Sequence, residues 1–229
     1  MFNETSREPT QVAMKVKVLV KELVDSNIQL SNEAPPDPDS HFWFFDLDPG
    51  LVSRSKTCLA HHSPWEIRLE EQEFLKWRSA LEKNVLMVDG ASKGNPGKAG
   101  GGGVLFDTTG KLILSFAWGL GQASNNLAEY LALWQGLVQA KDLSIMNLVV
   151  IGDSRNVIQS FSQKKRPKDF VLSQIYSKTL NCMADFENLT FYHVLRGLNH
   201  LADQEANVGA SMSRGEILIN GKETYRPVP

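Results

Sequence analysis

The sequence is poor in cysteine and has no long apolar run. Its 229 residues include two cysteines, Cys58 and Cys182, too few for a disulfide framework, and we expect both to be reduced thiols. No stretch approaches the roughly 18 uninterrupted apolar residues of a membrane-spanning helix, so no membrane partner is expected. Residues 1–11 lack the basic-then-apolar order of a secretory signal, which predicts an intracellular protein. With 42% apolar and 22% charged residues, the composition is that of an ordinary globular protein.

The formal charge is nearly balanced, but the two parts of the chain differ in sign. The total is −2, from 24 basic and 26 acidic side chains. Residues 1–82 contain 9 basic and 14 acidic side chains, and residues 83–229 contain 15 and 12. We therefore predict an N-terminal extension (1–82), a domain (83–212) and a C-terminal tail (213–229). The basic excess of the second part is compatible with a nucleic-acid partner, against which the whole-chain charge would argue.

The N-terminal extension has local patterns but no catalytic spacing. Apolar residues recur at helical spacing over 11–30, and the acidic, Pro-rich stretch 31–40 is typical of an extended linker. An aromatic patch follows at 42–45. Ser63-Pro64-Trp65-Glu66 predicts a helix start, with Ser63 as N-cap, and this helix is expected to run to about Lys83. We interpret the extension as structural.

Beyond residue 83, short apolar runs alternate with amphipathic stretches. Strands are expected over 85–90, 99–107, 111–120, 148–153 and 189–196, and helices over 124–141, 155–162, 169–182 and 199–211. This order, β-β-β-α-β-α-α-β-α, predicts an α/β fold. Its five-stranded mixed sheet would begin with an antiparallel meander, continue with parallel crossovers and carry helices on its faces.

Four acids occupy the places where such a fold gathers reactive groups. Asp89 ends the first strand and Asp153 ends the fourth, whereas Glu129 and Asp203 lie in the first turns of two helices. Any one of them is explained as a solvent-facing group, but four together suggest a site. Two carboxylates ~4 Å apart repel by about 4 kcal/mol at an effective dielectric near 20. Oxygen-only ligands therefore predict Mg²⁺ or Mn²⁺, and no Cys/His cluster competes for zinc.

The glycine-rich segment after Asp89 is not a phosphate-binding loop. Before Gly97-Lys98 the required glycine position holds Ser92, and Ala99 stands where Ser or Thr is needed. The run Gly100–Gly103 leads into a strand, whereas a dinucleotide fingerprint opens a helix. These glycines either let another backbone approach closely or form a loose hairpin.

Ser124-Asn125-Asn126 precedes Glu129 and predicts a helix cap. One cap is enough for one helix start, so at least one of these residues has only that structural role. A second amide beside an acidic cluster is suited to hydrogen-bond the sugar or base edges of a nucleic acid.

Four motifs in order resemble type 1 ribonuclease H, in the reverse-transcriptase-like form of plant proteins and retroelements: VDGASKGNPGKAGGGGVL, SNNLAEYLAL, VIGDSRNVIQSF and HVLRGLNHLADQEAN. The resemblance covers about residues 84–212. It implies a ribonuclease H-like fold and two-metal endonucleolytic hydrolysis of the RNA strand in RNA–DNA hybrids. It also implies a catalytic, metal-binding set of Asp89, Glu129, Asp153 and Asp203, and substrate-binding amides at Asn95, Asn125 and Asn126.

Two features depart from the family pattern. The histidine-bearing loop that many members have after the last strand is short here, because Gly197-Leu198 alone separates Arg196 from Asn199. We interpret His193 and His200 as structural, whereas Arg196 matches an arginine of the short-loop branch and is placed to bind phosphate. The basic protrusion is also missing. Its remaining basic residues either follow a DNA backbone or solvate a loop; they are Lys164, Lys165, Arg166 and Lys168.

The resulting hypothesis is that Asp89 bridges two Mg²⁺ ions. Glu129 and Asp153 complete one site, Asp203 assists the other, and the asparagines contact ribose 2′-hydroxyls. The main alternative is a catalytically silent nucleic-acid-binding module. A transposase or junction resolvase of the same broad fold is a further alternative, disfavoured by the order of the acids and by the asparagine pair. Residues 1–82 show no polymerase carboxylate pair, so polymerase activity is not expected, and we expect a monomer.

Overall fold

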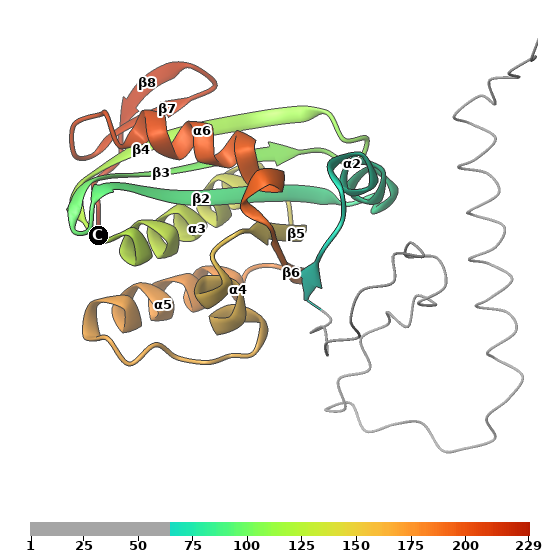
Figure 1. The fold of residues 1–229 in the computed structure, drawn as a ribbon, viewed down its shortest axis with the longest axis horizontal. Coiled ribbons are helices and arrows are strands. Elements are labelled where there is room, and N and C mark those ends of the chain that lie inside the picture. Colours follow the sequence, from blue (N-terminus) through green and yellow to red (C-terminus); the bar gives the residue numbers. More distant parts are fainter. Residues whose placement is uncertain (1–64) are drawn as a thin grey trace, which may run out of the picture. The chain divides into compact units, whose positions relative to one another are not determined.

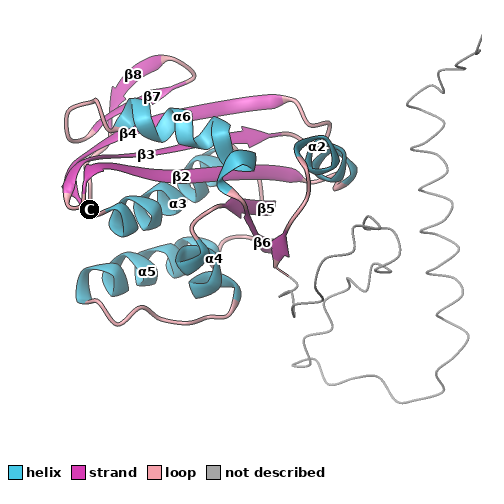
Figure 2. Ribbon diagram, viewed as in Figure 1, coloured by secondary structure: helices cyan, strands magenta, loops and turns pink. Residues whose placement is uncertain are grey.

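In the computed structural model the described residues are 65–229, and they form one mixed sheet with helices on both faces (Figures 1 and 2). Several sequence features lie outside the described residues: the expected helix 11–30, the linker 31–40, the aromatic patch 42–45 and Cys58. Cys182 is a free, half-buried thiol, as expected.

The sheet has eight strands within the described residues, not the five that the sequence predicted. They are β1 (Glu66–Ile67), β2 (Asn84–Gly94), β3 (Gly97–Phe106), β4 (Leu112–Ala123), β5 (Asn147–Gly152), β6 (Asn188–Val194), β7 (Glu216–Ile219) and β8 (Lys222–Tyr225). The five expected strands are β2 to β6. The three additional strands have two to four residues each, too few for a side-chain alternation to be recognised in the sequence.

The strand order is β1-β6-β5-β2-β3-β4-β7-β8. Strands β2, β3 and β4 pair antiparallel as a meander, whereas β5 is parallel to β2, and β6 is parallel to β5. The predicted mixed sheet is therefore confirmed. β5 ends at Gly152 opposite Val88, whereas β2 continues to Gly94, so the carboxyl end of β5 lies beside the middle of β2.

Helices cover the two faces of the sheet in two groups, apparent in Figure 1. One face carries α3 (Asn125–Asp142), α4 (Arg155–Ser162) and α5 (Phe170–Met183), and the other carries α2 (Glu71–Ala80) and α6 (His200–Gly209). A 3-10 turn, η1 (Arg196–Asn199), leads into α6. Among residues 65–229, no helix is both long and apolar enough to cross a membrane.

The alternation of side chains along β2 shows why this strand reads as a continuous apolar run. Val85 and Met87 belong to the apolar cluster on the α6 side, whereas Leu86 and Val88 belong to the cluster on the α3 side. A strand that is covered on both faces has no polar side to display. The next residue on the α6 side is Asp89, so a carboxylate continues a buried row.

The glycine run of β3 lets a helix backbone approach the sheet, which confirms one of the two readings of these residues. A Cβ added at Gly102 would lie 2.1 Å from the backbone N of Ala206 on α6, and one at Gly100 would lie 2.0 Å from the N of Ala210. No side chain fits at such distances, so glycine is what brings α6 against the sheet.

The helix predicted from Ser63 to about Lys83 begins later than expected. Trp65 forms a turn, Glu66 and Ile67 form β1, and α2 starts at Glu71. Trp65 is buried in the core and β1 pairs with β6. Tertiary burial and strand pairing thus override the local capping pattern.

The sheet also extends past both boundaries that the sequence analysis places at residues 83 and 212. β1 and α2 precede residue 83, and β7 pairs with β4 after residue 212. Ile217 on β7 is buried, and the indole N–H of Trp118 on β4 donates to the carbonyl of Arg226 at 3.0 Å. Residues at both ends therefore belong to the folded unit.

Candidate active site

Asp89 and Asp153 come from the neighbouring strands β2 and β5. β5 pairs with β2 as far as Gly152, opposite Val88, so Asp89 is the first residue of β2 beyond its neighbour and Asp153 follows β5 directly. Asp89 is 3% exposed. The expectation that Asp89 ends its strand is wrong, because β2 continues to Gly94. The two acids meet because β5 ends beside Val88, the residue before Asp89.

Glu129 reaches the same place from the first turns of α3. Ser124 caps this helix by accepting a hydrogen bond from the backbone N–H of Leu127 at 3.2 Å. The backbone N–H of Gly90 donates to Oε2 of Glu129 at 3.2 Å, which ties the helix to β2. Glu129 is 8% exposed, so its carboxylate has little water around it.

The three carboxylates form one cluster. One oxygen from each of Asp89, Glu129 and Asp153 lies within 4.8 Å of the others. Burial, followed by the charge of Asp153 and a hydrogen bond to it, raises the pKa of Asp89 to about 8. Burial, followed by the charges of Asp89 and Asp153, also raises the pKa of Glu129 well above its usual range. The cluster therefore favours a proton or a cation, and its oxygen-only donor set fits Mg²⁺ or Mn²⁺.

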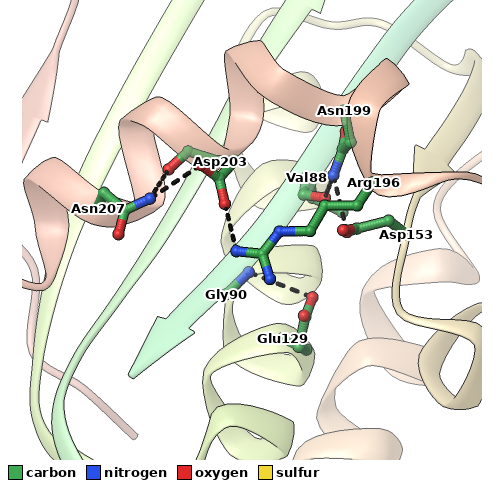
Figure 3. Close-up of polar contacts among 8 residues, drawn as sticks. All are labelled: Val88, Gly90, Glu129, Asp153, Arg196, Asn199, Asp203 and Asn207. Atoms are coloured by element: carbon green, nitrogen blue, oxygen red, sulfur yellow. Dashed lines mark hydrogen bonds and ion pairs between the residues drawn. The ribbon is translucent and has the colours of Figure 1, made fainter. Parts of the chain in front are cut away.

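Asp203 stands beside this trio with partners of its own. It lies in the first turn of α6, where a guanidinium N–H of Arg196 donates to its Oδ1 at 2.8 Å and Nδ2 of Asn207 donates to its Oδ2 at 3.0 Å. Figure 3 shows the Arg196 side chain reaching from η1 to Asp203. The Asp203 charge still contributes to raising the pKa of Asp89. All four predicted acids thus share one neighbourhood, with three in direct proximity.

Asn199 is a site residue that the sequence analysis missed. It is fully buried, and its Nδ2 donates to the carbonyl of Val88 at 2.9 Å and to Oδ1 of Asp153 at 3.0 Å (Figure 3). The amide therefore orients one carboxylate and ties it to β2. Its place at a helix start suggested a cap, yet its side chain makes no cap hydrogen bond. The signal in the sequence that could have indicated this role was a polar residue directly after an apolar one, Leu198.

The two histidines lie at different distances from the cluster. His193, on β6, places Nε2 3.0 Å from the backbone carbonyl of Asp153, and since a carbonyl only accepts, the ring nitrogen donates. His200 is exposed at the start of α6. The predicted structural role of His193 is compatible with this contact to the backbone.

The three asparagines lie at the start of α3, the helix that carries Glu129, and in the turn beside it. Oδ1 of Asn95, in the β2–β3 turn, accepts a hydrogen bond from the backbone N–H of Asn125 at 3.1 Å. Ser124 supplies the α3 cap, so the side chains of Asn125 and Asn126 are not needed for it. Asn95 and Asn125 are exposed and Asn126 is half-buried, which leaves these amides open to a ligand.

The basic residues 164–168, which stand where other family members have a basic protrusion, lie in the loop that joins α4 to α5. Arg166 donates to the hydroxyls of Ser173 and Ser177 at 2.7 and 3.2 Å, so it is held against α5. Lys164, Lys165 and Lys168 are exposed. None of the four takes part in the carboxylate cluster.

The matched family fits this architecture. A family described as "Reverse transcriptase-like" matches residues 87–209, more than half of the chain. The chain belongs to this family. The matched range contains all four acids, the asparagines, Arg196 and Asn199, and the expected resemblance is confirmed.

Curated relatives and solved structures agree with the family. The "Bifunctional protein Rv2228c" of Mycobacterium tuberculosis is 33% identical over 126 residues, which are 55% of this chain and 35% of the relative. The crystal structure of RNase H1 from Halobacterium salinarum has a TM-score of 0.54 and 31% identity, covering 56% of this chain and 98% of that one. The crystal structure of LC11-RNase H1 in complex with an RNA/DNA hybrid has a TM-score of 0.54 and 28% identity, covering 56% of this chain and 97% of that one. The chain thus spans about a third of the mycobacterial relative, and its ribonuclease H-like fold is confirmed.

Mg²⁺ is expected to stabilise this member of the family more strongly as pH rises from about 5 to 8. The raised pKa of Asp89 means that its contribution to the stability of the metal-free fold is complete below about pH 4 and is lost as pH passes 8. A bound cation offsets the destabilisation that the ionised, buried Asp89 carboxylate causes at high pH. At tenfold excess over Kd it adds about 1.4 kcal/mol, or roughly 3–6 °C in Tm.

Thermal melts in EDTA and in Mg²⁺ at pH 5, 6.5 and 8 measure this effect. The increment in Tm should be smallest at pH 5, where protons compete for the carboxylates. An increment that is equal at all three pH values would show that the cation binds elsewhere.

Proposed function

We propose that this protein is a ribonuclease H that hydrolyses the RNA strand of RNA–DNA hybrids with the help of divalent cations. The observation that carries the proposal is the buried cluster of Asp89, Glu129 and Asp153 on an RNase H1-like fold. A shared fold does not decide chemistry, but an oxygen-only carboxylate cluster in which burial raises the pKa of Asp89 and of Glu129 is suited to hold catalytic cations.

Asp89, Glu129 and Asp153, together with the neighbouring Asp203, are the residues that would hold two Mg²⁺ ions. Bound Mg²⁺ supplies charge neutralisation at the phosphate and lowers the pKa of water to make a nucleophile at neutral pH. Asn199 keeps the Asp153 carboxylate oriented through its 3.0 Å hydrogen bond. The Gly90 N–H does the same for Glu129. Arg196, 78% exposed beside Asp203, is placed to bind a phosphate oxygen.

The asparagines support a hybrid as the substrate. Asn95 and Asn125 are joined by a hydrogen bond, and Asn125 and Asn126 are the first residues of the helix that carries Glu129. Amides there are suited to contact ribose 2′-hydroxyls in a wide minor groove, which distinguishes the RNA strand from DNA. LC11-RNase H1, which shares this fold, has been seen with an RNA/DNA hybrid. The exposed Lys164, Lys165 and Lys168 would contact the DNA backbone.

The family description also supports a retroelement origin. The matching family is named for its likeness to reverse transcriptase, and the carboxylate cluster has not decayed. We therefore infer a retroelement-related nuclease that has kept its catalytic groups.

The purified protein is expected to cut the RNA of a labelled hybrid in Mg²⁺ and to leave single-stranded RNA and duplex RNA intact. The reason is that the asparagines would bind the 2′-hydroxyls of the RNA strand, while the shape of the hybrid positions the DNA strand. Gel analysis of end-labelled substrates measures internal cutting. Equal cleavage of all three substrates would contradict the proposal, and tight hybrid binding without cleavage would favour a silent binding module.

A further inference from the structure

A segment outside the family-matched range contacts His193, which in turn contacts the backbone of Asp153. β1 pairs in parallel with the end of β6, with Glu66 opposite His193. The backbone N–H of His193 donates to the carbonyl of Trp65 at 2.8 Å. Residues 65–67, which we call the β1 brace, thus lie against the strand that carries His193.

The side chain of Trp65 fixes the His193 ring. Trp65 is 7% exposed, and the two rings meet edge to face with their centroids 6.1 Å apart and an interplanar angle of 77°. Such an arrangement of aromatic rings is favourable beyond the burial of their surfaces. It leaves the imidazole little freedom to turn.

The other side of Trp65 is held by the residue that starts α4. The guanidinium carbon of Arg155 lies 5.7 Å from the Trp65 ring centroid, and Arg155 pairs with Oε1 of Glu66 at 3.2 Å. The Glu66 side chain is 6% exposed and that of Arg155 is 60% exposed, so the carboxylate of this pair is buried while its guanidinium faces solvent. Arg155 is two residues after Asp153. The β1 brace thus contacts the start of α4 directly, and it contacts the backbone of Asp153 through His193.

His193 completes the path by donating from Nε2 to the backbone carbonyl of Asp153 at 3.0 Å. Asn199 holds the carboxylate of the same residue. Asp153 is therefore fixed at its backbone by one group and at its side chain by another. Of these two supports, the first depends on residues before the start of the family match at residue 87.

We propose that Trp65 is a positioning residue for Asp153, acting through His193. This inference rests on the proposed function, because the ordered carboxylate is the one that would hold a catalytic cation. Partners that orient metal ligands are worth about 10–100-fold in metal affinity or activity. The β1 brace would thus support the active site.

Trp65→Ala is expected to weaken Mn²⁺ binding by about 10–100-fold, measured by titration calorimetry on the full chain without substrate. The kcat for hybrid cleavage should fall by a similar factor while KM for the hybrid stays within about twofold. Trp65→Phe should restore both, since it keeps an aromatic edge. It also removes an indole N–H that has no hydrogen-bond partner among the described residues.

Trp77→Ala is the matched control. Trp77 meets Tyr192, the preceding residue of β6, edge to face at 5.2 Å, but on the α6 side of the sheet and without a path to Asp153. It should lower Tm by an amount comparable to Trp65→Ala and leave Mn²⁺ affinity unchanged. Equal losses of affinity in both variants, or an unchanged affinity in Trp65→Ala, would overturn the inference.

His193→Ala keeps the test decisive if Trp65→Ala is unstable, and a double-mutant cycle adds to it if all variants fold. His193→Ala should reduce Mn²⁺ affinity to the same extent, and the double variant should lose no more than either alone. Additive losses would mean that Trp65 acts by another route. If the wild-type protein binds Mn²⁺ but cuts no hybrid, the proposed function fails while the affinity comparison still decides the role of Trp65.

Discussion

Replacing Asp89 by asparagine is expected to abolish hybrid cleavage, by roughly 10³-fold or more, while stabilising the metal-free protein. Asp89 is central to the cluster, and its buried carboxylate has a pKa of about 8. The amide has the shape of the protonated acid and cannot ionise, so it removes the repulsion with Asp153 and Glu129 and also the ligand. Cleavage rates under single-turnover conditions and Tm in EDTA at pH 8 measure the two effects.

Glu223→Gln is the control for this substitution, because Glu223 is an exposed acid on the edge strand β8. It should change neither the rate nor the Tm in EDTA. The Mg²⁺-dependent increment in Tm should vanish in Asp89→Asn and persist in Glu223→Gln. Cleavage that survives Asp89→Asn would mean that the carboxylate cluster is not the active site.

Gly90→Ala should destabilise the fold by about 3 kcal/mol or more and inactivate the enzyme, although it adds a single methyl group. A Cβ at this position would lie 2.2 Å from the backbone N of Glu129 and 2.4 Å from the carbonyl carbon of Ala128. The atoms in the way are helix backbone, so α3 must move as a whole. That shift would also break the hydrogen bond from the Gly90 N–H to Glu129.

Urea unfolding measures the loss of stability, and the Mg²⁺-dependent increment in Tm reports whether Glu129 is still in place. Gly197→Ala is the matched control, because a Cβ added at Gly197 would have no atom within 4 Å. It should be neutral or stabilise by up to about 1 kcal/mol. If Gly90→Ala unfolds at the same urea concentration as the wild type, the close contact of α3 with β2 is wrong.

The accuracy of the sequence-based predictions followed the range of the interactions involved. The helix expected over 155–162 has those bounds in the structure, because its apolar spacing is a local property. Asp89 and Asp153 lie together as expected, because β2 and β5 are parallel neighbours, although Asp89 lies within its strand and not at its end. By contrast, Asn199 contacts a residue 46 positions away, and no local pattern shows such a partner.

Trp65 illustrates the opposite outcome, in which a local signal was misleading. Its neighbours Ser63, Pro64 and Glu66 form a good helix start, yet Glu66 lies in a strand. The deciding interactions are the burial of the indole against the core and the pairing of β1 with β6. Both depend on a strand more than 120 residues further along the chain.

The sequence by itself determined the family and the main strands and helices, because these follow from residue patterns that are short and local, and it predicted the four acids as the site. The tertiary structure decided the rest. It set the trio of Asp89, Glu129 and Asp153 apart from Asp203 with its arginine, and it added the β1 brace and the β7–β8 strands to the sheet. Such contacts depend on which distant backbones pack together, and here glycines at the contact points allow that packing.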